Sequence, residues 1–127
     1  MSQKTVAQKM MIRPGARVLI LGAPPGYVRL FGALPKAATR LARGAKEVDV
    51  LQVFVKSRKE LEVQLPRLKR HLAASGALWV AYPKGSSKGG FDINRDVIWE
   101  YAQTLGLEAV ALIAIDDVWS TMRLKWA

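Results

Sequence analysis

A glycine-rich turn follows the first apolar run of the sequence. The turn contains Gly22, Pro24, Gly26 and Tyr27. Its glycines permit a ligand to approach the backbone closely, and its aromatic ring could stack on a planar group. We therefore predict that these four residues line a site for a small molecule.

A second polar segment, PKGSSKGGF, occupies residues 83–91 and precedes an expected helix. Lys84, Ser86 and Ser87 offer a cation and two hydroxyl groups there. Exposed N–H groups and the positive end of a helix favour bound anions such as phosphate. We predict that these three residues hold the anionic part of the ligand. The alternative is a flexible glycine–serine loop.

An acidic pair, Asp116 and Asp117, follows a late apolar run and lies close in sequence to Trp119. Adjacent carboxylates of this kind can bind Mg²⁺ or act as a base, and the indole could stack on a ligand. The alternatives are that the carboxylates cap a turn or pair with Arg95 or Arg123, and that the tryptophan belongs to the core. We assign the acidic pair and the tryptophan to the ligand-binding site.

Several familiar catalytic and metal-binding arrangements are missing from the sequence. It contains no cysteine, one histidine and no G-x-S-x-G motif, which excludes thiolate zinc sites and the common hydrolytic triads. The histidine, His71, lies beside the apolar stripe of an expected helix, and we interpret it as structural. We assign no residue as a metal ligand and identify no catalytic residue.

Positive charge is concentrated in the first third of the chain. Residues 1–46 contain nine Lys or Arg and no Asp or Glu, and the whole chain has a net charge of +10. Such asymmetry is typical of a surface for an anionic partner, although it also fits a solvated basic face. If nucleic acid is that partner, we expect it to contact Arg29, Lys36, Arg40 and Arg43, near aromatic rings that could stack on bases.

The sequence also bears on the protein's location. It has no apolar run of roughly 18 residues, which a membrane-spanning helix requires, and its polar N-terminus does not resemble a signal peptide. The absence of cysteine fits a reducing compartment. We therefore expect a cytoplasmic protein that does not bind membranes.

The expected secondary structure alternates between strands and helices. A capping box at Ser57 and Glu60 opens one helix, which runs to Gly76, and Asp92 caps another helix that ends before Gly106. The remaining expected elements are a helix over residues 3–12, strands over residues 17–21, 48–55, 77–82 and 109–115, and an alternating strand over residues 121–126.

Residues 27–46 allow two interpretations. Pro35 could open a helix that ends at Gly44, which would place the basic residues of this segment on one helical face. The segment could equally be a degraded strand.

Alternation of this kind predicts a small Rossmann-like α/β fold. We expect a mostly parallel sheet with an antiparallel C-terminal edge strand and flanking helices. Residues 1–127 are expected to form a single domain, in which residues 1–16 are an N-terminal helix and turn. Ligands of open parallel sheets bind at the carboxyl ends of the strands. The polar segments described above would therefore meet at the carboxyl ends of the strands.

Three segments resemble motifs of class I S-adenosylmethionine-dependent methyltransferases. They are MIRPGARVLILGAPPG, which is similar to the first motif of that family, EVDVLQVFV and LAASGALWVAYPK. Over nearly the whole chain, the sequence also resembles a family of short, uncharacterised bacterial proteins that share P-G-x-R-V-L, A-P-x-G-Y, S-R-x-E-L, P-K-x-S-S, N-R-D-V and D-D-x-W-S elements. These resemblances imply a truncated, methyltransferase-like Rossmann fold.

The sequence departs from the methyltransferase pattern where the cofactor would bind. Gly22 and Gly26 match the outer glycines of G-x-G-x-G, but Pro24 replaces the middle one, which adds a ring and removes an N–H group. Ile20 occupies the position of an expected acid, and residues 27–46 contain no acid to hold the ribose hydroxyls. The resemblance thus implies S-adenosylmethionine as a candidate cofactor, with a degenerate motif.

Three functional hypotheses follow. The first is a Rossmann-like protein that binds a small anionic or nucleotide-like ligand at the strand ends, with no catalysis required. The second is a nucleic-acid-associated module that uses the basic first third of the chain. The third is an atypical S-adenosylmethionine-dependent methyltransferase.

Overall fold

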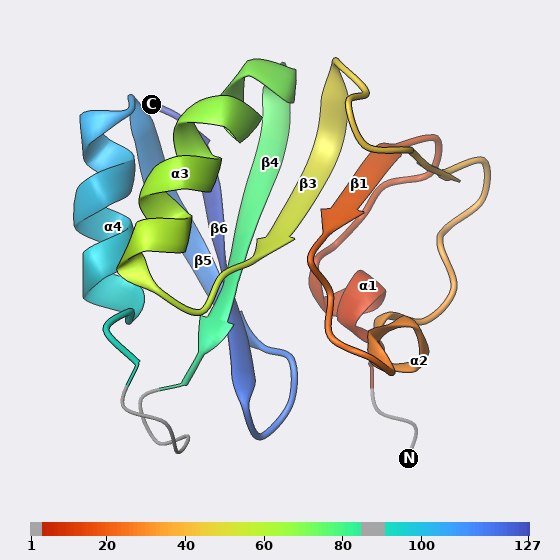
Figure 1. Ribbon diagram of the computed structural model, residues 1–127. Coiled ribbons are helices and arrows are strands. Elements are labelled where there is room, and N and C mark those ends of the chain that lie inside the picture. The colour runs from red at the N-terminus through yellow and green to blue at the C-terminus, as the bar shows by residue number, and fades with distance from the viewer. Residues whose placement is uncertain (1–3, 85–90) are drawn as a thin grey trace.

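The computed structural model describes residues 4–84 and 91–127, which form one sheet with helices on both faces (Figure 1). Within these residues the sheet has six strands in the order β2-β1-β3-β4-β6-β5. The strands are β1 (Arg17–Leu21), β2 (Thr39–Arg40), β3 (Val48–Phe54), β4 (Leu72–Pro83), β5 (Leu107–Ala114) and β6 (Trp119–Trp126).

Strand direction confirms the predicted fold class. β1 pairs in parallel with β2 and with β3, and β3 pairs in parallel with β4. β6 runs antiparallel to both β4 and β5. The domain is therefore a small Rossmann-like α/β fold with a mostly parallel sheet, and its C-terminal strand is antiparallel as predicted. The predicted edge position of the C-terminal strand is wrong, because β6 pairs with β4 on one side and β5 on the other, and β5 is the edge strand.

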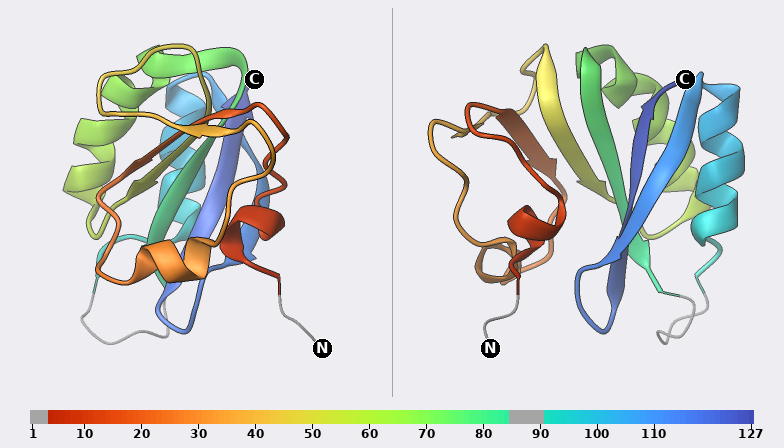
Figure 2. Two further views of the ribbon diagram at one scale, coloured as in Figure 1. Left: turned by 90° about the vertical axis from the view of Figure 1, so that its right-hand side faces the viewer. Right: turned by 180° about the vertical axis from the view of Figure 1, so that it is seen from behind.

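The helices are divided between the two faces of the sheet. α3 (Arg58–Leu68) and α4 (Arg95–Thr104) cover one face, and a short 3₁₀ helix, η1 (Lys69–His71), continues α3. α1 (Val6–Lys9) and α2 (Tyr27–Phe31) lie on the opposite face near β1. In the view from behind, no helix of the described chain lies over β4, β6 and β5 (Figure 2). No helix within residues 4–84 and 91–127 is long and apolar enough to cross a membrane.

The hydrophobic core has one part on each face of the sheet. On the α3 and α4 face, Leu61, Leu65 and Ile98 pack against alternate residues of the strands. On the other face, Val6 of α1 and Phe31 of α2 pack against β1 and β3. Because the central strands bury side chains on both faces, they appear in the sequence as continuous apolar runs. This explains why the sequence alone predicted them.

The helix considered for residues 35–44 is wrong, and the strand interpretation is correct for two residues. Ala37 adopts a positive φ of 64°, which a regular helix does not allow. The backbone N–H groups of Thr39 and Leu41 donate to Ala16 and Val18 instead. Pairing with the edge of β1 therefore determines the structure of this segment, and its basic residues do not form a helical stripe.

The helix that begins after Ser57 ends earlier than predicted. α3 stops at Leu68, and Leu72 already pairs with Val48 of β3. Gly76, predicted to end the helix, lies inside β4. A Cβ atom at Gly76 would lie 2.8 Å from the carbonyl oxygen of Val48. The glycine therefore permits a close approach between strands.

The predicted Ser57 cap of α3 is confirmed, but the reciprocal half of the capping box is wrong, because the Glu60 carboxylate accepts from the backbone N–H of Lys56 and not of Ser57. The Ser57 hydroxyl accepts a hydrogen bond from the Glu60 backbone N–H (3.1 Å).

The predicted cap of α4 is also wrong. Asn94 rather than Asp92 caps α4, because its side-chain oxygen accepts from the Val97 N–H (2.9 Å). Asp92 instead accepts from the backbone N–H of Arg58 (2.9 Å), so it stabilises the beginning of α3.

Candidate functional site

The carboxyl ends of β1, β3, β4 and β5 lie on the same side of the sheet (Figure 1). This side holds the glycine turn of residues 22–26, the segment at residues 55–57 and the acidic turn of residues 115–118. Lys84 lies at the end of β4, with its backbone N–H donating to the carbonyl of Val118 (2.7 Å). Ser86 and Ser87 lie outside the described residues.

The two aromatic residues assigned to the site are core residues. Tyr27 is 2% exposed and Trp119 is 8% exposed. The ring of Phe54 lies between them, with centroids 4.7 Å from Tyr27 and 5.1 Å from Trp119 in edge-to-face geometry. Stacking of either ring on a ligand, as predicted from the sequence, is therefore not available in this structure. Edge-to-face packing within the protein takes its place.

Tyr27 also belongs to a buried hydrogen-bond network. Its hydroxyl donates to Oε1 of Gln52 (2.5 Å), and Nε2 of Gln52 donates to the hydroxyl of Thr121 (3.3 Å). Gln52 and Thr121 are 0% exposed. Burial raises the pKa of Tyr27, and this effect exceeds the opposing effects of the Gln52 hydrogen bond and the Arg40 charge. The network connects α2, β3 and β6 across one face of the sheet.

We expect Tyr27→Phe to lower the free energy of unfolding by about 1–2 kcal/mol near neutral pH, because Oε1 of Gln52 loses its donor. The raised pKa means that the folded protein keeps the phenol proton at pH values where the unfolded chain has lost it. This contribution to stability is fully present below about pH 10 and is lost as the pH rises further. Urea unfolding of both proteins between neutral and alkaline pH checks this. An equal alkaline loss of stability in the variant would contradict it.

The acidic turn has a structural role. One side-chain oxygen of Asp116 accepts hydrogen bonds from the backbone N–H groups of Val118 (2.9 Å) and Trp119 (2.8 Å). This contact corresponds to the turn-capping alternative for Asp116. Asp117 is exposed beside it. A ligand-binding role for Asp117, and for Lys84 at the end of β4, stays a prediction.

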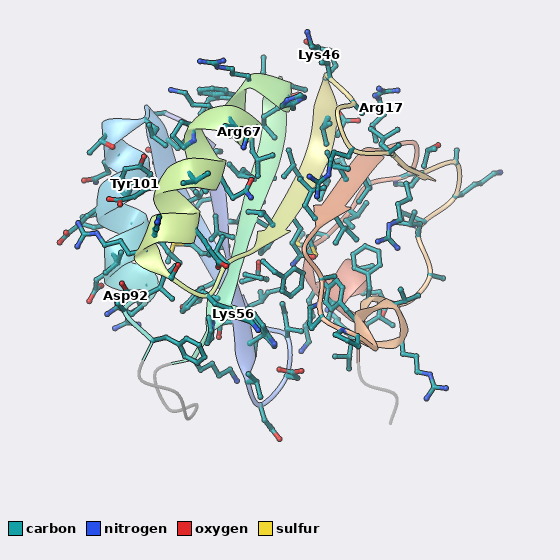
Figure 3. All side chains as sticks on the ribbon, viewed as in Figure 1. Arg17, Lys46, Lys56, Arg67, Asp92 and Tyr101 are labelled. Atoms are coloured by element: carbon teal, nitrogen blue, oxygen red, sulfur yellow. The ribbon has the colours of Figure 1, made fainter. Side chains whose placement is uncertain are left out.

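A groove of about 220 Å³ opens between β1 and α3. Gly22 lies in it together with Arg43, Arg67 and His71. Leu19 and Val53 belong to the apolar part of its lining. Arg67 comes from the last part of α3 (Figure 3), while Arg43 comes from the segment after β2. The groove therefore contains Gly22, which the sequence assigned to the small-ligand site, and Arg43, which it assigned to nucleic-acid binding.

Gly22 permits a close approach between the turn after β1 and the end of β3. Its φ is +72°, and a Cβ atom would lie 3.3 Å from the carbonyl oxygen of Phe54. A larger residue would therefore strain the backbone and press on β3. Gly26 (φ +84°) precedes α2, and Pro24 accepts a hydrogen bond from the Tyr27 N–H (3.2 Å). These two residues shape the turn, and neither belongs to the lining of the groove.

Arg67 and His71 also line the groove, and neither was assigned to the site from the sequence, where His71 is interpreted as structural. The Nδ1–H of His71 donates to the carbonyl oxygen of Ala45 (2.8 Å), which connects η1 to the segment on the other side of the groove. Gln64, Arg67 and His71 lie three and four residues apart and all belong to the lining. This spacing places polar side chains on one helical face, and it was the only feature of the sequence that could have indicated their place in the groove.

The residues assigned to nucleic acid lie outside a regular helical stripe. Arg29 is on α2, Arg40 is in β2, and Lys36 and Arg43 lie in the segments before and after β2. All four are exposed. They therefore remain available to an anionic partner along the β2 edge, although not in the arrangement expected from a helix.

No protein-family model and no curated protein sequence matches this chain. Solved structures do match. A TehB-like S-adenosylmethionine-dependent methyltransferase from Corynebacterium glutamicum superposes with a TM-score of 0.61 at 13% identity, covering 94% of this chain and 85% of that protein. This chain has the methyltransferase fold.

Two further structures support the same fold. An S-adenosylmethionine-dependent methyltransferase from Aquifex aeolicus gives a TM-score of 0.57 at 12% identity, with coverage of 94% and 86%. The Methanococcus jannaschii fibrillarin, a pre-rRNA processing protein, gives 0.58 at 16% identity, with coverage of 91% and 68%. The predicted methyltransferase-like fold is thus confirmed, and at these identities the likeness concerns the fold alone.

Proposed function

We propose that the protein binds a small anionic, nucleotide-like ligand in the groove between β1 and α3, which extends from Gly22 at the carboxyl end of β1 to Arg67 and His71 near the beginnings of β3 and β4 (Figure 3). The observation that supports this proposal is the presence of Gly22, Arg43 and Arg67 in one cavity of about 220 Å³. Guanidinium groups bind phosphate oxygens in a planar, bidentate manner. Because typical small-molecule sites begin at roughly 300 Å³, part of a nucleotide would extend from the groove into solvent.

The charge of the groove favours phosphate over a cationic ligand. Among the described residues, its lining contains two arginines and a histidine and no acidic side chain. Arg43 and Arg67 come from opposite sides of the cavity, so a phosphate between them could interact with both. We expect the protein to lie in the cytoplasm, where nucleotides are abundant. The absence of cysteine fits the reducing conditions of that compartment.

The residues present do not fit an ordinary S-adenosylmethionine site. Ile20, at the position of an expected acid, is 9% exposed and belongs to the core. The end of β2, where an acid would hold the ribose hydroxyls, carries Arg40 and then Arg43. The positively charged sulfonium of S-adenosylmethionine would meet further positive charge here. We therefore propose binding without methyl transfer and keep an atypical methyltransferase as the alternative that the fold supports.

Calorimetric titration with ADP, adenosine and S-adenosylhomocysteine tests these alternatives at moderately high salt. We expect ADP to bind more tightly than the other two ligands, because it alone carries phosphates for the arginines. Arg43→Ala and Arg67→Ala should each weaken ADP binding about tenfold, consistent with the loss of one charge-assisted contact. Arg29→Ala, on α2 and outside the groove, is the matched control and should leave the affinity unchanged.

Three results would count against the proposal. If ADP fails to bind, or if it binds equally well to the Arg43 and Arg67 variants, the groove is not the site. Tighter binding of S-adenosylhomocysteine than of ADP would favour the methyltransferase alternative, and methyl-transfer assays would follow.

The nucleic-acid hypothesis is supported by a separate observation. Arg29, Lys36 and Arg40 are exposed and lie near the β2 edge of the sheet. Binding of single-stranded RNA through them should weaken steeply as salt rises, with a slope that reflects the number of phosphates neutralised. A Lys36→Ala/Arg40→Ala variant should show a shallower slope. RNA binding that is absent or insensitive to salt would remove this hypothesis.

A further inference from the structure

A second cavity, of about 380 Å³, lies on the opposite face of the sheet from the proposed nucleotide groove. Its floor includes Val50 of β3 and Trp79 of β4, and the segment from Met10 to Ala16 forms one side. This is the face on which no helix of the described chain covers β4, β6 and β5 (Figure 2). The cavity is therefore bounded by the open part of the sheet and by the connection between α1 and β1.

Arg123 of β6 contributes an unsatisfied donor to this cavity. Its Nε atom is buried, and within residues 4–84 and 91–127 it has no hydrogen-bond partner. Arg123 lines the cavity and is the register partner of Trp79 on the neighbouring strand. A buried guanidinium donor without an acceptor is costly, because its hydration is lost and nothing replaces it. Because Nε is closed to solvent in this structure, an acceptor in the cavity reaches it only when the Arg123 side chain turns toward the cavity.

The other charges of the cavity favour a single negative charge in the ligand. Arg13 is exposed and lies in the lining, so it adds a second guanidinium. Asp49 is also in the lining, but one of its carboxylate oxygens already accepts from the backbone N–H of Arg17 (2.8 Å). Two cations and one anion leave one excess positive charge.

The apolar residues of the cavity favour an apolar body on the same ligand. Trp79 is 2% exposed and offers an aromatic surface on the floor. Met11 lies in the lining, is 78% exposed and adopts a positive φ of 57°. Methionine is flexible and adapts to the shape of a bound group, so this exposed side chain could close over a ligand.

We propose that this cavity is a second binding site, for a small organic acid that carries one carboxylate or phosphate group on an apolar or aromatic body. The Arg123 side chain turns toward the cavity, and the acid group then accepts hydrogen bonds from its Nε and a terminal nitrogen, in the side-on bidentate geometry of a guanidinium. Arg13 supplies further positive charge, and the apolar body lies between Trp79 and Met11. The site uses no residue of the groove between β1 and α3, so either proposal can fail without the other.

Nuclear magnetic resonance of the ¹⁵N-labelled full chain tests this proposal with benzoate, phenyl phosphate and benzamide as probes. We expect the Arg123 Nε–H and Trp79 indole N–H signals to shift in a saturable manner with benzoate or phenyl phosphate. The relative affinity of these two probes distinguishes a carboxylate site from a phosphate site. Benzamide, which is similar in shape to benzoate and uncharged, should cause no saturable shift.

Variants locate the binding. Arg123→Gln should weaken binding of the tighter-binding probe at least tenfold. Arg123→Lys keeps the charge but loses the planar pair of N–H donors, so it should weaken binding by an intermediate factor. Arg13→Gln lies in an exposed segment and provides a second variant if Arg123→Gln does not fold. Arg70→Gln, in η1 and outside this cavity, is the control and should bind as the unmodified protein does.

The proposal is overturned if neither acid produces saturable shifts of the two signals at millimolar concentration. It is also overturned if benzamide shifts them as strongly as benzoate does, or if the Arg123 and Arg13 variants bind the acids with unchanged affinity.

Discussion

Replacing Gly32 with valine is expected to lower the free energy of unfolding by about 4 kcal/mol. Gly32 ends α2 with φ 82° and ψ −169°, a backbone conformation that is essentially restricted to glycine. A Cβ atom there would lie 2.5 Å from Cγ2 and 2.6 Å from Cβ of Thr5, the residue that caps α1. Backbone strain and steric overlap therefore act together at this position.

Urea unfolding measures the effect, with Gly15→Val as the matched control. Gly15 has a similar φ of +80°, and among the described residues no neighbouring atom lies within 4 Å of the position that a Cβ atom would occupy. Gly15→Val should therefore lower the free energy of unfolding only through backbone strain, without steric overlap. If Gly32→Val and Gly15→Val lose equal stability, close packing of α1 against α2 does not contribute.

Residues 27–46 were difficult to predict because their two elements, α2 and β2, are short. α2 is five residues long, and its stability comes from burial of Tyr27 and Phe31 in the core rather than from a periodic pattern. β2 is two residues long and exists because it pairs with the edge of β1. Both elements depend on contacts between distant parts of the chain, which a local pattern does not contain.

The sequence predicted the long, strongly patterned elements well. The apolar runs around residues 17–21 and 48–55 became β1 and β3, and the Ser57 cap opens α3 as expected. Residue type could not distinguish the predicted cap of α4, Asp92, from the observed cap, Asn94, because both side chains can accept a hydrogen bond from the N–H groups at a helix N-terminus. Asp92 is hydrogen-bonded to Arg58, a contact with a different helix that only the tertiary structure reveals.

The fold class predicted the position of Gly22, but it did not predict the groove in which Gly22 lies. Parallel strands bring their carboxyl ends to one edge, so the position of Gly22 followed from the fold class. The burial of Tyr27 and Trp119 did not follow, because an aromatic residue near a strand end can face either a ligand or the core. The sequence did not reveal that Arg67 and His71 line the groove, because the side of α3 that faces β1 depends on the strand order.

Gly76→Ala is the second substitution with a large expected effect, a loss of about 3 kcal/mol in the free energy of unfolding. The added Cβ would lie 2.8 Å from the carbonyl oxygen of Val48, 2.8 Å from Cδ1 of Leu72 and 3.0 Å from the carbonyl oxygen of Ala73. Two of these three neighbours are backbone atoms of the sheet. They cannot move without disturbing the pairing of β3 with β4, whose register already shifts between Val48 and Val50.

A double-mutant cycle with Leu72→Ala separates the side-chain contact from the backbone contacts. Leu72→Ala removes the overlap with Cδ1 and leaves both carbonyl oxygens in place, so Gly76→Ala should remain nearly as destabilising in that background. Ser75→Thr adds one methyl group at an exposed neighbouring position and should change stability little. Full rescue by Leu72→Ala would mean that the leucine alone, rather than the close approach of the two strands, requires glycine at this position.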